Sequence, residues 1–231
     1  DALPPSVTIR SRGMFGIFER AKPPVFPVSA INVSKLLVSV VPLPIEEVLK
    51  VRSQQMQSWQ YDPQVETLPS AVNTTIPVNA GLNKTFRTEI DLSKIMGSKL
   101  KPGLYAFVVQ SPEELNWETK LPMKHVQLVG LTNMALTMKY SGNRALVWVT
   151  DMTTGASVPG VAVTLYALSG EAIASGNTNA KGLYEAPLDL TKFSSPNNQY
   201  NPEFYATATK GDDIAFVGSN WSEGMQPWDW N

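Results

Sequence analysis

The sequence contains one histidine, His125, and histidine is the residue type most often used for proton transfer near neutral pH and for metal binding. It is accompanied neither by cysteine nor by carboxylates at the spacing of a metal site. We therefore interpret His125 as a structural side chain, and we expect no metal and no other cofactor.

Adjacent carboxylates occur at Glu46-Glu47, Glu113-Glu114 and Asp212-Asp213. General acid–base catalysis needs carboxylates that converge, but neighbours on a strand point to opposite faces and neighbours on a helix diverge by about 100°. The segment from Lys210 to Asp213 is more simply predicted as a hairpin turn. The pairs do not indicate catalysis, so we expect that the chain is not an enzyme.

The last twelve residues carry three of the six tryptophans, Trp221, Trp228 and Trp230. Aromatic side chains that are exposed together often mark binding surfaces, so these residues could form a platform on which sugars stack. We favour the alternative that they pack within the second domain or against a neighbouring domain. They are therefore predicted to form an interdomain or partner surface.

Composition excludes several classes of function. The net charge of -1 gives no basic field for nucleic acid, and the absence of cysteine excludes disulfides, thiolate chemistry and an internal thioester. No apolar run approaches the roughly 18 residues of a spanning helix, and residues 1–5 lack the pattern of a signal peptide. We expect a mature chain or a piece of a longer one.

The elements that must position these residues are mainly strands. Residues 144–185 read as four strands separated by turns at Thr154-Gly155, Pro159-Gly160, Ser169-Gly170 and Lys181-Gly182. The first of them, 145–150, is apolar on both faces, with Leu146 and Trp148 on one of them. We expect a central strand that is covered on both sides.

The whole chain is predicted to be all-β, with two tandem immunoglobulin-like or fibronectin-like antiparallel sandwiches. The first spans 1–124 and ends in a connection at 111–124, and apolar residues at helical spacing predict a helix at about 45–58, which packs on a sheet face or beside a sheet edge. The second spans 125–231 and holds seven strands in about 100 residues, as in immunoglobulin-like domains.

The blocks Val147-Trp148-Val149-Thr150-Asp151, Pro159-Gly160-Val161 and Thr178-Asn179-Ala180-Lys181-Gly182 resemble a macroglobulin-like domain near the N-terminal part of bacterial α2-macroglobulins. The first domain is similar to such a domain too, through Pro44-Ile45-Glu46-Glu47-Val48-Leu49 and Leu100-Lys101-Pro102-Gly103-Leu104-Tyr105. The resemblance extends over most of residues 6–220.

The family implied by this resemblance consists of large periplasmic proteins that trap proteases. A protease cuts a bait segment, the body rearranges, and in many members a thioester captures the attacker. The chain has neither a thioester motif nor a recognisable bait region. The resemblance therefore implies a two-domain structural scaffold fragment whose partners are neighbouring macroglobulin-like domains and, through the full-length parent, target proteases. The alternative is a cell-envelope adhesin or carbohydrate-binding module.

Overall fold

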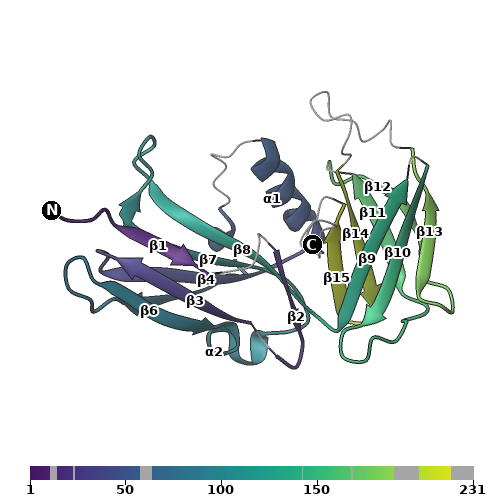
Figure 1. Ribbon diagram of the computed structural model, residues 1–231, viewed down its shortest axis with the longest axis horizontal. Helices are drawn as coiled ribbons and strands as arrows, with labels where there is room; N and C mark the ends of the chain where they lie inside the picture. Colours follow the sequence, from purple (N-terminus) through teal and green to yellow (C-terminus); the bar gives the residue numbers. More distant parts are fainter. Residues whose placement is uncertain are drawn as a thin grey trace, which may run out of the picture. The chain divides into compact units, whose positions relative to one another are not determined.

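The computed structural model describes residues 1–10, 15–22, 24–57, 64–141, 143–167, 169–189 and 203–219, without the side chains of 52–57. Contacts between Cα atoms divide the chain into two compact units (Figure 1). Unit 1 comprises Asp1–Pro44 and Tyr61–Leu131, and unit 2 comprises Ile45–Gln60 and Thr132–Asn231. The backbone therefore passes between the units three times.

Unit 1 is built from two antiparallel sheets. One has the strand order β1-β3-β6 and the other the order β2-β8-β7-β4-β5. The elements are β1 (Ser6–Ile9), β2 (Phe15–Glu19), β3 (Val25–Ile31), β4 (Lys35–Leu43), η1 (Val65–Thr67), β5 (Val72–Pro77), β6 (Thr85–Asp91), α2 (Leu92–Met96), η2 (Gly97–Lys99), β7 (Gly103–Leu115) and β8 (Pro122–Thr132).

The core of unit 1 follows from alternation along its strands. Leu36, Val38 and Val40 of β4 are fully buried in one cluster with side chains from both sheets. Phe26 of β3 stacks on Phe107 of β7 at a ring-centroid distance of 4.8 Å, which joins the two sheets. Strand β7 is central in its sheet, and all six residues from 104 to 109 are buried, as its two apolar faces predict.

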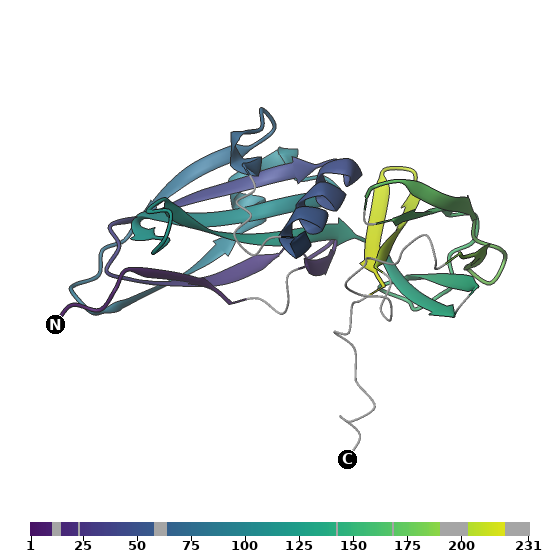
Figure 2. The same cartoon turned by 90° about the horizontal axis from the view of Figure 1, so that it is seen from above.

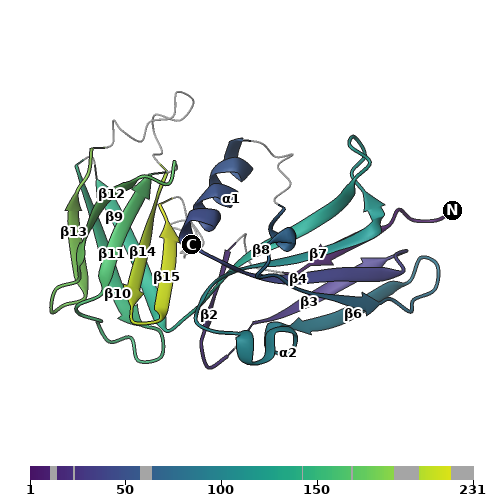
Figure 3. The same ribbon diagram turned by 180° about the vertical axis from the view of Figure 1, so that it is seen from behind.

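Besides the helical segment, the described residues of unit 2 form seven strands in two antiparallel sheets, in the orders β13-β10-β9 and β12-β11-β14-β15. The bounds are β9 (Met134–Ser141), β10 (Arg144–Asp151), β11 (Ala162–Ala167), β12 (Ala172–Asn177), β13 (Leu183–Pro187), β14 (Phe204–Lys210) and β15 (Asp213–Gly218). Figures 2 and 3 show the two sheets from different sides. The predicted all-β class and the seven strands are confirmed.

The turns of unit 2 use the residues expected of them. Asp151 Oδ1 accepts hydrogen bonds from the backbone N–H of Thr153 and Thr154, at 3.0 and 2.8 Å, and these bonds close the turn after β10. Thr178 Oγ1 accepts from Val161 N at 2.9 Å. Gly182 has φ +72°, and a Cβ there would lie 2.6 Å from a backbone carbonyl oxygen. These residues of the family-like blocks thus shape turns.

The predicted helix is present as α1 (Ile45–Gln57). It begins directly after Pro44, and Glu46 and Glu47 lie in its first turn, where the helix dipole favours negative charge. Val48 and Leu49 are buried. Among the described residues, no helix combines the length and the apolar character needed to cross a membrane.

The expected connection at 111–124 is wrong, because most of these residues belong to a long hairpin. Strands β7 and β8 pair from Gly103↔Leu131 to Leu115↔Pro122. Strand β8 ends at Thr132 and β9 begins at Met134, so the start of the predicted second domain at residue 125 falls inside β8. The units divide after Leu131, not after residue 124.

The junction between β8 and β9 is the single residue Asn133. Its backbone N–H donates to Asp213 Oδ2 at 3.0 Å, and its carbonyl accepts from Met152 N at 2.8 Å. Both partners lie in unit 2, so the hydrogen bonds of Asn133 attach it to that unit.

The expectation that β10 is covered on both faces is also wrong within the described residues. Strand β10 is central, and Val147 and Val149 on its inner face are fully buried. On the outer face, however, Trp148 remains 42% exposed and donates its indole N–H to Ser157 Oγ at 3.3 Å. Sequence shows that both faces are apolar, but it does not show what covers the second one.

Candidate interaction surfaces

His125 lies on β8 and pairs with a carboxylate that the sequence does not place beside it. Its Nε2 is 2.8 Å from Glu114 Oε2 on β7. The paired strands bring the two residues together although eleven positions separate them. The described residues contain no group of three or more potential metal-ligating side chains. The pair therefore joins two strands.

An irregularity in the β7–β8 hairpin separates the two members of the Glu113-Glu114 pair. Residues 111–114 of β7 lie opposite the single residue Met123, because Gln110 pairs with Lys124 and Leu115 with Pro122. Glu114 then reaches His125, whereas Glu113 faces the β3–β4 turn. The two carboxylates do not converge, as the sequence predicted.

Glu113 joins the hairpin to the β3–β4 turn. Its carboxylate accepts hydrogen bonds from Ser34 N at 3.1 Å and from the hydroxyls of Ser34 and Ser111. Burial raises the pKa of Glu113, but these hydrogen bonds favour the ionised form more strongly, so its pKa lies below the ordinary value. The ionised carboxylate therefore ties β7 to the β3–β4 turn.

A nearly buried ion pair involves the same hairpin, at the last strand pair before its irregularity. Lys124 Nζ is 2.6 Å from Glu66 Oε1, and the two side chains are only 9% and 13% exposed. Glu66 belongs to η1, so the pair ties the segment after α1 to β8. Such a pair needs both partners, since either charge alone would be buried without compensation.

The tip of the hairpin exposes a cluster of apolar side chains. Trp117 is 75% exposed, and Leu115, Leu121 and Met123 are exposed beside it. Leu3 and Leu82 are exposed at the same end of unit 1, where the N-terminus, the β5–β6 connection and the hairpin tip lie (Figures 1 and 3). We call these six side chains the end surface.

Sequence reasoning missed the end surface, because it assigned residues 111–124 to a connection. The signal that could have found it is the placement of Leu115 and Trp117 before a polar turn and of Leu121 and Met123 after it. Apolar residues that flank a turn at the end of two long strands indicate a hairpin tip with a contact surface.

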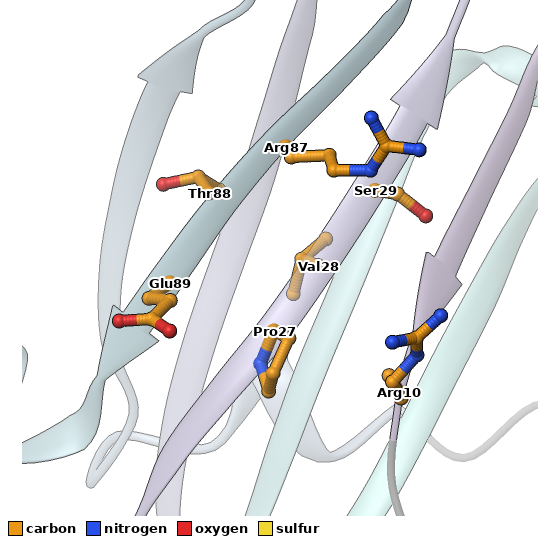
Figure 4. A pocket seen from close by; sticks show the side chains of 7 residues that line it. All are labelled: Arg10, Pro27, Val28, Ser29, Arg87, Thr88 and Glu89. Atoms are coloured by element: carbon orange, nitrogen blue, oxygen red, sulfur yellow. The ribbon is translucent and has the colours of Figure 1, made fainter.

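A groove of about 430 Å³ lies on the outer face of the β1-β3-β6 sheet (Figure 4). Arg10 and Arg87 approach it from the two outer strands, with Ser29 of β3 between them. Glu89 lies on the same face. Guanidinium groups donate hydrogen bonds to anions but cannot act as general bases, so this arrangement is suited to binding and not to acid–base chemistry.

The other predicted candidates take structural positions. Asp213, in the β14–β15 hairpin, accepts a hydrogen bond from Asn133 N. In α1, Glu47 Oε2 lies 3.7 Å from Lys50 Nζ, one turn further along the helix. The predicted interdomain or partner surface of Trp221, Trp228 and Trp230 lies outside the described residues and stays a prediction.

Comparison with known proteins identifies similar domains. Residues 131–231 match the family model of the bacterial alpha-2-macroglobulin MG3 domain. No curated protein sequence matches the chain.

Solved structures of bacterial alpha-2-macroglobulins share the fold. An Escherichia coli structure spanning domains NIE-MG1 has a TM-score of 0.66 at 19% identity and aligns over 93% of this chain and 96% of that one. A second, spanning MG0-NIE-MG1, has a TM-score of 0.65 at 17% identity, over 93% of this chain and 64% of that one. The Salmonella protein reacted with methylamine has a TM-score of 0.62 at 18% identity, over 94% of this chain and 12% of its own.

Proposed function

Because residues 131–231 match the family model of the bacterial alpha-2-macroglobulin MG3 domain, we propose that the chain is a scaffold segment of a bacterial protease inhibitor of this type. The family match is the observation that carries the proposal. In this role the two units hold other parts of a longer protein in place and catalyse no reaction themselves. The parent would act in the periplasm, as in the family that the sequence resembles.

The chemistry of the described residues supports a scaffold. The carboxylates of Glu66 and Glu114 are engaged with Lys124 and His125, and Glu113 binds two serines. These groups fix loops to strands and leave no acid and base facing a shared space. Two separate apolar cores and an exposed apolar end surface are features of a module that is stacked among others.

The two E. coli alignments support a further module ahead of residue 1 in the parent. The chain covers 96% of the structure that spans NIE-MG1, but only 64% of the one that spans MG0-NIE-MG1. The remaining part of the second structure therefore corresponds to MG0, which its domain order places first. The partners we propose are such neighbouring modules and, through the complete parent, target proteases.

A comparison of the isolated chain with the complete parent tests the proposal. Each is incubated with trypsin, and the remaining activity is measured on a small peptide and on a large protein substrate. We expect the parent to suppress cleavage of the large substrate only, and the isolated chain to leave both unchanged. Inhibition by the isolated chain would contradict the scaffold role, and glycan binding that is lost on Trp228→Ala and Trp230→Ala would favour an adhesin.

A further inference from the structure

We infer that the end surface of unit 1 is the docking site of the module that precedes residue 1 in the parent, with Trp117 as the central anchor. The inference rests on the proposed function, because it requires a parent with such a module. It adds the place of contact and the residues that make it.

The distribution of exposed apolar side chains indicates a contact. Ten large apolar side chains are exposed among the described residues, and six of them lie at this end of unit 1, four in the β7–β8 hairpin and two in the N-terminal segment and the β5–β6 connection. Trp117 is 75%, Leu82 71% and Leu121 59% exposed. Single exposed apolar residues are ordinary, but a concentration at one end of a domain marks an interaction site.

Hydrogen bonds around Trp117 order the backbone of the hairpin tip. Asn116 Oδ1 accepts hydrogen bonds from the backbone N–H of Glu118 and Thr119, both at 2.9 Å, while its own N–H donates to the Leu121 carbonyl at 2.9 Å. Lys120 closes the turn by donating to the Asn116 carbonyl at 3.0 Å. An ordered backbone reduces the conformational entropy that is lost on binding, and an exposed tryptophan on such a turn is typical of interface hot spots.

The start of the chain is fastened at the same end. Asn83 Oδ1 accepts from Leu3 N at 2.8 Å and from Asn32 Nδ2 at 2.9 Å, while Asn83 Nδ2 donates to the Asp1 carbonyl at 3.1 Å. Asn32 lies two residues before Ser34, which binds Glu113 of the hairpin. The β3–β4 turn thus contacts both the first residues of the chain, through Asn32, and the hairpin, through Ser34.

This placement identifies the occupant. A module joined to Asp1 leaves unit 1 beside the end surface, so its effective concentration there is far above that of any free partner. The hairpin tip exposes the apolar Trp117 and Leu121 and, between them in the sequence, the oppositely charged Glu118 and Lys120. It therefore fits a module face with an apolar recess for the indole and a mixed polar rim.

Thiol labelling tests the contact directly, because the chain has no cysteine of its own. Leu121→Cys places a thiol on the end surface, and Met152→Cys is the matched control in unit 2, at a residue that is 36% exposed. Each is made in this chain and in the parent extended by the preceding module, with the parent's other cysteines replaced by serine. The rate of reaction with a small maleimide is then measured.

We expect the preceding module to slow labelling of Leu121→Cys at least tenfold and to change Met152→Cys less than twofold. Adding Trp117→Ala to the extended parent should raise the labelling rate of Leu121→Cys at least fivefold. Equal rates for Leu121→Cys with and without the module would overturn the docking inference and leave the proposed function intact. A gene that encodes no module ahead of residue 1 would also overturn the docking inference, whereas inhibition of trypsin by the isolated chain would overturn the proposed function.

Discussion

Replacement of Lys124 by methionine is the sharpest test of how the β7–β8 hairpin is held. Methionine keeps the apolar stem and removes the charge that lies 2.6 Å from Glu66 Oε1. Glu66 Oε2 has no hydrogen-bond partner, so the carboxylate would be left buried and uncompensated. Loss of one partner from a buried pair costs about 3–5 kcal/mol. Because both side chains keep about a tenth of their exposure, we expect about 3 kcal/mol.

Two further variants separate burial of the charge from loss of the contact. The double replacement Lys124→Met with Glu66→Met removes both charges, and we expect a free energy of unfolding within about 1 kcal/mol of the original chain. Arg144→Met is the control, because the Arg144–Glu185 pair is as close, at 2.7 Å, but its side chains are 68% and 55% exposed. Loss of the Arg144–Glu185 pair should lower the free energy of unfolding by at most about 0.5 kcal/mol.

Urea titrations of the four proteins, followed by circular dichroism, give the free energies of unfolding. Because Lys124 belongs to unit 1 and Arg144 to unit 2, the transition that moves in each variant also identifies the unit. A cost for Lys124→Met that is no larger than that for Arg144→Met would refute the reasoning, since the pair would then behave as a solvated surface contact.

The remaining predictions concern protonation, backbone strain and burial. The pKa of Glu113 is lowered below its ordinary value of 4.5, so its ionised form stabilises the fold above that pH, and this stability is lost as the pH falls through the lowered pKa. Glu113→Gln should therefore flatten the decline of the urea midpoint between about pH 5 and pH 3, and an unchanged decline would contradict this. Gly182→Ala should cost about 3 kcal/mol because its Cβ would meet a backbone carbonyl at 2.6 Å, whereas Gly155→Ala, with φ +70° and open space, should cost about 1 kcal/mol in the same urea assay. Phe107→Ala should cost about 3–5 kcal/mol and Trp148→Ala less than about 1 kcal/mol, and calorimetric unfolding enthalpies and midpoints for the two variants would expose any reversal of that order.

The sequence predicted the parts of the fold that local chemistry decides. The seven strands of unit 2 follow from alternation and from turn residues such as Gly160 and Gly182, which adopt positive φ. The helix after Pro44 follows from apolar residues at helical spacing and from two glutamates in its first turn. These signals need only a few neighbouring residues, so a single sequence contains them.

The features that were missed depend on pairing between distant segments. A strand interrupted by charged residues looks like a connection until its partner is known, and β7 continues through Glu113 and Glu114 because β8 returns beside it. For the same reason, His125 has a carboxylate partner that its sequence neighbours do not reveal. Likewise, alternation marks Trp148 as facing outward but cannot specify which surface covers that face.

The sequence position of α1 has a consequence for inheritance. The helix is encoded between two strands of unit 1, but its contacts group it with unit 2. A gene exchange at the 131/132 border would give the recipient unit 2 without its own helix and would leave that helix behind in the donor. We therefore expect the two units to be inherited together, as one continuous gene segment.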